Sequence, residues 1–367
     1  MRVALVHDYL TQFGGAERVL LALMDLFPDA PVFTLVHDQK SMIDSFDQSR
    51  VRTSFLQRLP GARRHHRFFP MLMPLAIEQL DFSGFDVVLS GSHSFGKGII
   101  TGPETMHVSY CFTPIRYAWD DSHRYVREFS SGPWLHHLAP MALSYIRLWD
   151  YYAAQRVDSY ITLSDFVARR IKKYYGRDSI VIPPPINVES FDVAQNEGDY
   201  FLVVSRLVPY KRVDLAIDAC EKLGVPLKVV GTGPEEKELR RRAGKWTEFL
   251  GFVPEEELAI YYSGAKALLF PQEEDFGITP LEAAACGKPT IAFKAGGALE
   301  TVVDGETGVF FESQDSNSLI DAILGFSHIA WDSVNIRQHA ELFSRDQFLH
   351  KIQEEVHNQW MAFRSRN

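Results

Sequence analysis

The chain has 367 residues, 46% of them hydrophobic and 23% charged, which is the composition of a soluble globular protein with room for two domains. Its formal net charge of −9 argues against general nucleic-acid binding through a basic surface. Three cysteines, Cys111, Cys220 and Cys286, are far apart and odd in number, which excludes a disulfide framework and a zinc-binding spacing.

The first predicted element is a buried strand over residues 3–6, and this apolar start is too short for a signal peptide. A helix follows from near Gly15, because Val19, Leu20 and Leu23 have helical spacing. Gly14 and Gly15 therefore lie in a strand-to-helix turn. It is either a plain tight turn or a place where backbone N–H groups approach an anion.

Further strand-like runs alternate with helical segments through the first half, at residues 32–36, 87–90, 108–112 and 159–163. This alternation predicts an α/β protein with a parallel sheet wrapped by helices. No apolar stretch approaches about 18 residues, so we expect no transmembrane helix and a cytoplasmic location.

Residues 58–74, RLPGARRHHRFFPMLMP, break the alternation, because arginine and histidine are mixed with large apolar residues. Such a mixture suits an anionic lipid surface, where each nearby cation contributes about 1 kcal/mol. The lipid interpretation predicts peripheral contact with the cytoplasmic face of a membrane. The alternative is a connecting loop whose apolar half packs into the core.

SGSHSFGKG, residues 90–98, follows a strand end and carries the polar residues Ser92, His93, Ser94 and Lys97. The carboxyl edge of a parallel sheet is the usual place for a site, so we predict one here. A lone histidine is often structural, and both a structural and a catalytic role stay open for His93.

A hinge is predicted between two domains. Ser164 is expected to cap a helix that ends at Gly176. The three prolines at 183–185 cannot continue a helix or a central strand, so they form a stiff connection. The domains are then residues 1–185 and 186–343, with a terminal helix in residues 344–367.

The second half shows six strand-like runs separated by helical stretches, at residues 200–205, 227–230, 249–252, 267–270, 290–293 and 309–311. They predict a second doubly wound parallel sheet. Gly231 and Gly233 form a turn after the second of these strands. Neither this turn nor the one at Gly14 has the G-x-G-x-x-G pattern, so a dinucleotide-binding enzyme finds no support.

Two cations follow the first strand of this half, Arg206 at its end and Lys211 at the start of the next helix. A planar guanidinium and a point charge suit phosphate oxygens, and each charge-assisted bond is worth roughly 1.5–3 kcal/mol. The alternative is a pair of unrelated surface cations.

Residues 271–289, PQEEDFGITPLEAAACGKP, form a loop after a strand and a short helix over residues 279–286. Glu274 lies in the loop and Glu282 in the helix, with seven residues between them. One carboxylate can accept hydrogen bonds from two neighbouring hydroxyls, so the pair suits a sugar or a ribose. The alternative is a solvated acidic loop beside a glutamate on a helix surface.

This segment and the following CGKPTIAFKAGG resemble the signature of retaining glycosyltransferases of family four, which have the GT-B fold. The resemblance covers most of the chain. It implies two Rossmann-like domains that face a cleft, with the first binding the acceptor, the second binding the nucleotide sugar, and the C-terminal helix crossing back onto the first.

The resemblance also implies roles for single residues. Glu274 would contact the donor sugar, Glu282 the ribose, and Arg206 with Lys211 the diphosphate; His93 completes the predicted catalytic set. The remaining residues predicted to bind the nucleotide sugar are Gly14, Gly15, Gly231, Gly233, Phe252, Val253, Phe276, Gly277, Ile278 and Thr279.

One segment departs from the family. SYCFTPIRYAWDD, residues 109–121, carries Phe112 where the family typically has a histidine that touches the donor sugar. Either His93 or another group contacts the sugar hydroxyl that the family histidine would touch, or that hydroxyl is left without a contact. Arg116, Trp119 and Asp120 are candidates for acceptor contacts.

The sequence therefore predicts a retaining hexosyltransferase of polysaccharide or glycolipid biosynthesis. It would move a hexose, with mannose from GDP-mannose as the first choice, to a lipid-linked saccharide or a similar hydroxyl acceptor. No Asp-x-Asp motif or metal-spaced cluster occurs, so we expect a metal-independent reaction without a resident cofactor. The alternatives are a nucleotide-dependent dehydrogenase, a catalytically silent sugar-nucleotide binder, which Phe112 would favour, and a soluble-sugar synthase or phosphorylase of the same fold.

Overall fold

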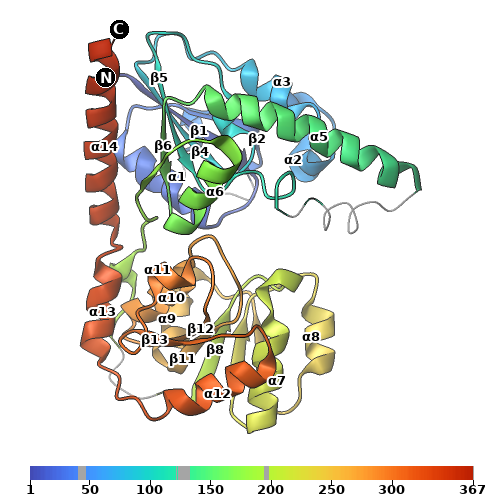
Figure 1. Cartoon of the computed structure of the whole chain (residues 1–367), viewed down its shortest axis with the longest axis vertical. Coiled ribbons are helices and arrows are strands. Elements are labelled where there is room, and N and C mark those ends of the chain that lie inside the picture. Colours follow the sequence, from blue (N-terminus) through green and yellow to red (C-terminus); the bar gives the residue numbers. More distant parts are fainter. Residues whose placement is uncertain (40–46, 121, 123–132, 194–197, 367) are drawn as a thin grey trace. The chain divides into compact units, whose positions relative to one another are not determined.

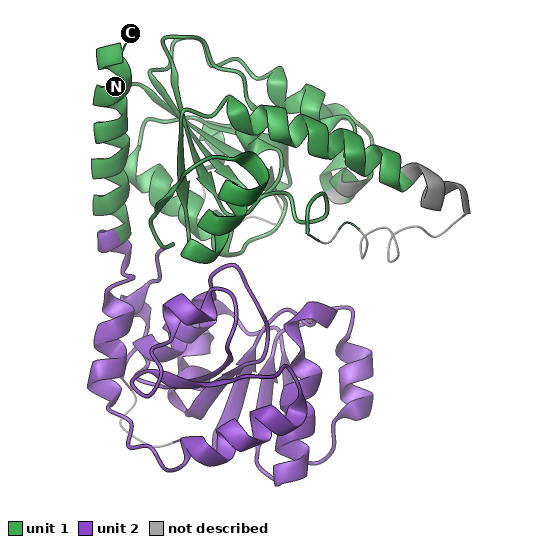
Figure 2. Ribbon diagram, viewed as in Figure 1, with its two compact units in different colours: residues 1–184, 348–367 green, residues 185–347 purple. Residues whose placement is uncertain are grey.

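The computed structural model of the chain describes residues 1–39, 47–120, 122, 133–193 and 198–366. They form two compact units, residues 1–184 with 348–367 (unit 1) and residues 185–347 (unit 2), which Figure 2 distinguishes by colour. Each unit is a parallel sheet flanked by helices (Figure 1) and has its own hydrophobic core. The predicted class, α/β with a doubly wound sheet in each half, is confirmed.

The sheet of unit 1 has seven parallel strands in the order β3-β2-β1-β4-β5-β6-β7. They are β1 (Val3–Leu10), β2 (Val32–His37), β3 (Val51–Thr53), β4 (Val87–Ser92), β5 (Met106–Cys111), β6 (Ser159–Thr162) and β7 (Ile180–Val181). All five predicted strands are present, because strands covered on both faces are near-continuous apolar runs. The sequence pattern misses β3 and β7, which are edge strands of three and two residues.

β1 extends four residues beyond its predicted end, because the polar His7 and Asp8 lie inside the strand and are completely buried. The strand order changes direction between β1 and β4, which are neighbours in space although β2 and β3 separate them in sequence. His7 pairs with Gly91, so the carboxyl ends of the two strands lie side by side. Open α/β sheets bind ligands at such a change of direction.

The helices among the described residues of unit 1 are α1 (Gly15–Leu26), α2 (Ala62–His65), α3 (Met73–Glu78), α5 (Pro133–Gln155), α6 (Asp165–Tyr175) and α14 (Arg345–Arg366). The predicted caps of α6 are confirmed. The Ser164 hydroxyl accepts a hydrogen bond from the Val167 amide at 3.1 Å, and Gly176 adopts the left-handed conformation with φ 68°. These caps satisfy backbone groups that the helix itself leaves unpaired.

The C-terminal helix α14 packs against unit 1. Its buried residues are Phe348, Ile352 and Val356. The Phe348 ring lies 5.9 Å from the ring of Tyr110 in β5, centre to centre. Most of the helix, from Phe348 onward, is therefore part of the first unit, although it follows the second in sequence.

Residues 55–78 form a series of short helical turns, which are η3 (Phe55–Arg58), α2, η4 (His66–Phe68) and α3. Met73 is buried in the core, whereas Phe68 is 81% exposed and Met71, Leu72 and Leu75 are exposed as well. The apolar residues of this segment are thus divided between the core and the surface. No helix among the described residues combines the length and the apolar character that crossing a membrane requires.

The sheet of unit 2 has six parallel strands in the order β10-β9-β8-β11-β12-β13, and its direction changes between β8 and β11. They are β8 (Tyr200–Val204), β9 (Leu227–Val230), β10 (Thr247–Gly251), β11 (Ala265–Phe270), β12 (Thr290–Phe293) and β13 (Gly308–Phe311), which confirms all six predicted strands.

The described helices of unit 2 are α7 (Val213–Leu223), α8 (Glu236–Arg242), α9 (Glu255–Ser263), α10 (Ile278–Ala285), α11 (Ala298–Thr301), α12 (Ser316–Phe326) and α13 (Ser333–Glu341). Four short 3₁₀ turns complete the described elements, namely η2 (Gln48–Arg50), η5 (Gly96–Gly98), η6 (Val188–Ser190) and η7 (Pro209–Lys211).

Candidate active site

The carboxyl ends of β8 and β11 in unit 2 bring together residues from two separate motifs. Lys211 Nζ donates a hydrogen bond to Glu274 Oε1, and Gln272 Nε2 donates to the same oxygen at 3.0 Å. The side chains of Lys211 and Glu274 are 13% and 24% exposed. Lys211 lies in η7 rather than in a helix start as predicted, because Arg212 adopts a left-handed conformation (φ 51°) and delays α7 to Val213.

Arg206 also follows β8, and its side chain is exposed. Its Nη2 donates to the Tyr210 hydroxyl at 3.3 Å, while Lys211 Nζ lies 5.2 Å from the centre of the same ring. Both predicted cations therefore contact Tyr210 at the carboxyl end of β8. A guanidinium has five N–H donors, and this one is open to an anion such as phosphate.

Glu282 lies inside α10 with only 3% of its surface exposed. Its Oε2 accepts a hydrogen bond from the Tyr262 hydroxyl at 2.7 Å. A buried carboxylate without such a partner would be strongly destabilising. The interpretation of Glu282 as a solvated residue on a helix surface is therefore wrong.

The loop that carries Glu274 rests on the glycine turn before α11. The Gly297 amide donates to the Glu274 carbonyl oxygen at 2.8 Å. A Cβ atom on Gly297 would lie 2.2 Å from Phe276 Cα, so only glycine allows this approach. Phe276 itself is buried, and its ring centre lies 5.9 Å from that of Phe343.

Gly277 ends the same loop in a left-handed conformation, with φ 95°. α10 then begins with Ile278 and Thr279. The first N–H groups of a helix have no partner within the helix, so this end can donate to an anion.

Gly231 and Gly233 follow β9 and pack against the segment that carries Arg206. A Cβ atom on Gly231 would lie 1.9 Å from the Ser205 carbonyl oxygen, and one on Gly233 would lie 2.2 Å from that of Leu207. Both glycines are therefore required for close backbone packing. Their predicted contact with a nucleotide stays a prediction.

Phe252 and Val253 follow β10 and differ in accessibility. Phe252 is 78% exposed, whereas Val253 is 9% exposed. An exposed phenyl ring directly after a strand end leaves a flat apolar face that could stack on another aromatic ring.

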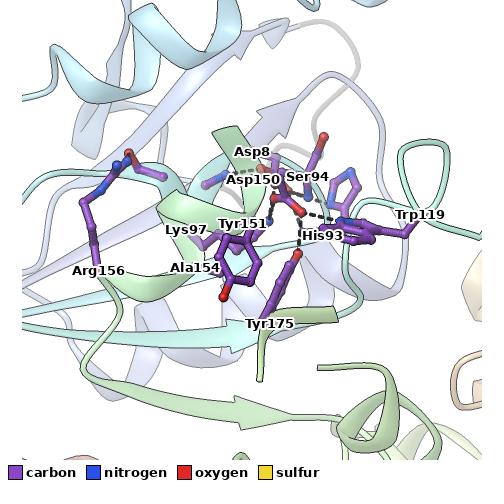
Figure 3. A network of polar contacts seen from close by, with 12 residues as sticks. Asp8, His93, Ser94, Lys97, Trp119, Asp150, Tyr151, Ala154, Arg156 and Tyr175 are labelled. Carbon is purple, nitrogen blue, oxygen red and sulfur yellow. Dashed lines mark hydrogen bonds and ion pairs between the residues drawn. The ribbon is translucent and has the colours of Figure 1, made fainter. Parts of the chain in front are cut away.

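The carboxyl ends of β1 and β4 in unit 1 hold a second polar group, part of which is drawn in Figure 3. The buried Asp8 accepts hydrogen bonds at Oδ2 from the amides of His93 and Ser94, at 2.7 and 2.9 Å, and at Oδ1 from the amide of Gly96. Nδ1 of His93 lies 2.9 Å from Asp8 Oδ2. Asp8 is not among the site residues predicted from the sequence, where its signal is a polar pair, His7 and Asp8, next to an apolar strand.

The two groups of this pair change each other's protonation. Burial alone would raise the pKa of Asp8, but the charge and hydrogen bonds of His93 bring it well below its usual range. Burial alone would lower the pKa of His93, but the Asp8 carboxylate raises it above its ordinary value. The carboxylate and imidazolium forms are therefore favoured together.

α1 begins at Gly15, with Gly14 as its N-cap. Gly14 is in extended backbone that any residue adopts, and a Cβ atom there would lie 3.4 Å from Glu17 Oε2. Glu17 is buried in the first turn, and its Oε1 lies 3.2 Å from His7 Nε2. This helix start therefore already carries a buried carboxylate, which would compete with a bound anion for the positive end of the helix.

Phe112 follows β5 and is 8% exposed. Its ring centre lies 5.2 Å from that of Tyr110 and 6.4 Å from that of His7. The ring of His93 lies at the same distance, 6.4 Å, from His7. A phenyl ring offers a sugar hydroxyl no hydrogen bond, and His93 is a polar ring in the same neighbourhood.

Of the predicted polar cluster, only His93 is accessible, because Ser92, Ser94 and Lys97 are buried. The side chain of Lys97 is 0% exposed, and its Nζ lies 2.5 Å from Asp150 Oδ1 and donates to the Ser94 carbonyl oxygen at 2.7 Å. Figure 3 shows Lys97 beside Asp150. Lys97, a member of the predicted polar cluster, is therefore closed off from solvent, and it supports the turn that carries His93.

The candidates for acceptor contacts are engaged within the chain. The Trp119 indole N–H donates to Asp150 Oδ2 at 2.8 Å, and Asp120 accepts from Arg170 and Tyr174 of α6. Arg116 also interacts within the chain. Among the described residues, no three His, Cys, Asp or Glu side chains are grouped so that they could hold a metal ion.

Two family models match the chain and together span residues 13–341. The model described as Glycosyltransferase Family 4 matches residues 13–190. The model described as Glycosyl transferases group 1 matches residues 187–341. The boundary between the two matches falls close to the division between the two units.

Curated relatives match parts of the chain. The GDP-mannose-dependent alpha-(1-6)-phosphatidylinositol monomannoside mannosyltransferase of Mycolicibacterium smegmatis is 37% identical over 146 residues, 34% of this chain and 38% of that protein. The O-antigen chain mannosyltransferase C of Escherichia coli is 29% identical over 175 residues, 42% of this chain and 46% of that protein. Glycogen synthases are also among the relatives. The chain spans half or less of the length of these curated relatives.

Solved structures extend the likeness over the whole chain. The Anabaena protein HepE, solved in complex with UDP, superposes with a TM-score of 0.72 over 98% of this chain and 100% of its own. The two sequences are 19% identical, so this likeness establishes the fold alone.

Proposed function

We propose that this chain, which the family models and relatives indicate to be a GT-B glycosyltransferase of the family-four type, is a retaining hexosyltransferase with a nucleotide sugar as donor. The observation that carries the proposal is the contact of Lys211 with Glu274 where the sheet of unit 2 changes direction. A cation beside a carboxylate suits a sugar diphosphate. Lys211 would stabilise the charge of the departing diphosphate, and Glu274 would accept from sugar hydroxyls.

The remaining donor contacts follow the same chemistry. Arg206 supplies a second cation, and Glu282, held by Tyr262, accepts from the ribose hydroxyls. Phe252 and Val253 hold the base. Ile278 and Thr279 would supply backbone N–H groups to the diphosphate, while Gly231, Gly233, Phe276 and Gly277 shape the loops around it.

In the proposed reaction the acceptor oxygen bonds to the anomeric carbon while the bond from that carbon to the diphosphate oxygen breaks. The departing diphosphate takes the electron pair of the broken bond and the proton of the acceptor hydroxyl. No resident cofactor enters this balance. His93 would donate to an oxygen of the substrate, a contact that the side chain of Phe112 cannot make.

For the donor and acceptor we propose mannose from GDP-mannose and a lipid-linked saccharide or similar hydroxyl. Two relatives are mannosyltransferases by name, and one of them acts on a phosphatidylinositol mannoside. The glycogen synthases among the relatives support a second candidate, a synthase that uses soluble sugar.

We also propose peripheral contact with an anionic membrane through residues 58–74. Arg58, Arg63 and Phe68 are exposed there, and residues 48–77 contain no Asp or Glu although the chain has 47 such residues among 367. Arginine beside exposed apolar side chains suits an anionic lipid surface.

Helix α5 extends this surface. It is joined to α3 by the Trp149 indole N–H, which donates to Glu78 Oε1 at 2.9 Å. From residue 139 onward its exposed positions hold no charged residue, and they are Pro140, Met141, Ser144, Tyr145, Leu148, Tyr151, Tyr152 and Gln155. A solvent-facing helix surface is normally charged, and Tyr beside Leu and Met suits the boundary between lipid and water.

Thermal unfolding with candidate donors, followed by a transfer assay, tests the function. A ligand at about 100 times its dissociation constant adds roughly 2.7 kcal/mol of stability, so the true donor should raise the Tm above the other UDP-, GDP- and ADP-sugars. Transfer to lipid extract with retained anomeric configuration is then expected. No shift with any nucleotide sugar would contradict the proposal. A shift without turnover would indicate a silent binder, and transfer to free sugar without lipid would indicate a soluble-sugar synthase.

A further inference from the structure

Asp8 fixes both the backbone and the side chain of His93. Its carboxylate is completely buried and accepts from three amides in the turn that follows β4, those of His93, Ser94 and Gly96. The same carboxylate lies 2.9 Å from Nδ1 of the His93 ring. Lys97 holds the turn from the other side by donating to the Ser94 carbonyl oxygen at 2.7 Å. The turn therefore has little freedom to move its histidine.

The contact with Asp8 favours a proton on one of the two ring nitrogens. A bare Nδ1 would place its lone pair against the lone pairs of the carboxylate 2.9 Å away, so a proton on Nδ1 is favoured, although this contact lacks the alignment of a hydrogen bond. Nδ1 is buried, whereas 38% of the His93 side chain is exposed. The ring thus turns its Nδ1 edge to Asp8 and leaves its opposite edge, with Nε2, as the part that a ligand can reach. The Tyr9 ring packs on it edge to face, with centres 5.9 Å apart.

We propose that Asp8 is a positioning residue that holds His93 so that Nε2–H donates to an oxygen of the bound substrate. The inference rests on the proposed transferase function. Three features carry it together, namely the buried carboxylate at the change of strand direction, its contact with Nδ1, and the exposure of the rest of the ring. A histidine beside a carboxylate is a common arrangement for fixing a ring and its charge.

The charged groups around His93 favour the imidazolium form, in which both ring nitrogens donate. Asp8 on β1 and Glu17 on α1 are negative, and Lys97 in η5 is positive. Burial opposes the charge on the ring, but Asp8 raises the pKa of His93 above its ordinary value, with a smaller contribution from Glu17. The ring of His7 lies 6.4 Å from that of His93, centre to centre. The Tyr9 ring lies between His93 and His66, and it stacks on the ring of His66.

A purely structural role for Asp8 would need only the three amide contacts. Replacing Asp8 would then lower stability and leave the titration of His93 unchanged. The two roles therefore differ in the pH dependence of His93, which nuclear magnetic resonance measures directly without any substrate.

The test compares the wild-type protein with Asp8→Asn and His93→Gln. In the wild type we expect His93 to be protonated on Nδ1 when neutral and to titrate above 6.5, the ordinary value. In Asp8→Asn the pKa of His93 should fall. At a pH above the pKa values of both proteins, each unit by which the pKa falls leaves about tenfold less imidazolium. kcat/KM of the wild type should therefore fall as pH rises through the pKa of His93, and that of Asp8→Asn should fall at lower pH.

His93→Gln serves as the conservative control, because the amide of Gln can donate from about the position of Nε2 but does not titrate. It should keep part of the activity and lose this step in the pH profile. Identical titration of His93 in wild type and Asp8→Asn would overturn the proposal. If Asp8→Asn does not fold, the wild-type protein alone still tests the proposal. A neutral His93 that carries its proton on Nε2 would overturn the proposal. A failure of the wild type to bind any nucleotide sugar by calorimetry would instead refute the proposed function and leave the resonance result standing.

Discussion

Lys211 carries the charge on which the proposed reaction depends most. Its ammonium group is held by Glu274 at a mostly buried position, where a charge acts more strongly than in bulk water. We expect Lys211→Ala to lower kcat by about 10² to 10³, because a preorganised group that stabilises the leaving diphosphate is lost. Initial rates at saturating donor measure the effect. Lys237→Ala on the exposed face of α8 is the matched control and should keep nearly full activity.

His107 in β5 makes unit 1 sensitive to acid. It is completely buried with Nε2 2.9 Å from the Ser90 hydroxyl, and burial, aided by the charge of Arg156, lowers its pKa from 6.5 to about 3. Its folded-state pKa is below the unfolded value, so protonation favours unfolding. Its contribution to stability is complete above pH 6.5 and declines as the pH falls toward 3.

Urea unfolding of wild type and His107→Gln at pH 7 and pH 5 measures this contribution. One proton changes the free energy of unfolding by at most about 1.4 kcal/mol per pH unit. Between pH 7 and pH 5 the free energy of unfolding of the wild type should therefore fall by about 1–2 kcal/mol more than that of the variant. His93 acts in the opposite sense, because its raised pKa gives stability that is lost as the pH rises, but both proteins share it. Equal losses in the two proteins would show that His107 is not the acid-sensitive group.

At the level of elements, the loop after β11 is built by backbone packing that tolerates no side chain. A Cβ atom on Gly297 would lie 2.2 Å from Phe276 Cα, and the Gly297 amide bonds the Glu274 carbonyl. Gly297→Ala must displace the loop that carries Glu274. We expect it to cost about 2–4 kcal/mol in the free energy of unfolding and to weaken donor binding.

Gly325→Ala is the matched control for this prediction. Gly325 lies within α12, and apart from its chain neighbours and the backbone of its own helix no described atom lies within 4 Å of where its Cβ would be. The substitution should therefore raise stability by about 0.5–1 kcal/mol, because alanine favours the helix. Denaturant unfolding of both variants, with calorimetric donor binding, checks the pair. A Gly297→Ala protein that is as stable as the wild type would refute the account of this loop.

The elements that could be predicted from the sequence are those with a strong local signal. The six strands of unit 2 are apolar runs between helices, and the caps of α6 at Ser164 and Gly176 are local chemistry. The length of β1 is underestimated because the strand contains a buried polar pair, His7 and Asp8, whose partners lie on other elements. Local patterns carry no information about such partners.

The candidate site shows the same limit more sharply. Lys211 and Glu274 were predicted from separate motifs, and only the strand order of unit 2 brings these residues, 63 positions apart, into contact. Asp8 and His93 are 85 positions apart and meet because β1 lies next to β4. Lys97 was predicted as a member of a polar cluster at the sheet edge, and its buried partner Asp150 lies on α5, far away in the sequence.

At the scale of the whole molecule, charge is distributed unevenly. The chain has a net charge of −9, yet residues 48–77 have arginines and histidines without any acidic residue, and exposed apolar side chains lie among them. A protein of this charge would be repelled from an anionic membrane unless one face carried the opposite sign. Residues 58–74 are that face in our proposal, and α5 provides the apolar area beside it.

Sedimentation with vesicles tests this proposal. Wild-type protein should bind vesicles that contain anionic lipid, bind neutral vesicles less, and lose binding as salt screens the charges. Replacing the exposed Arg58 and Arg63 with alanine removes two cations worth about 1 kcal/mol each, so the partition coefficient should fall by about thirtyfold. Replacing Lys237 and Lys245 of unit 2 with alanine changes the net charge equally and should leave binding unchanged.

The apolar part of the surface needs a separate variant. Leu148 on α5 is 58% exposed, so Leu148→Ser should weaken binding to anionic and neutral vesicles alike and keep the salt dependence. Loss of one buried leucine side chain corresponds to about 1.5–3 kcal/mol, a decrease that sedimentation can resolve. If Leu148→Ser binds as well as the wild type while the arginine variant does not, the contact is electrostatic alone and α5 remains in water. If both variants bind as the wild type does, neither segment meets the membrane.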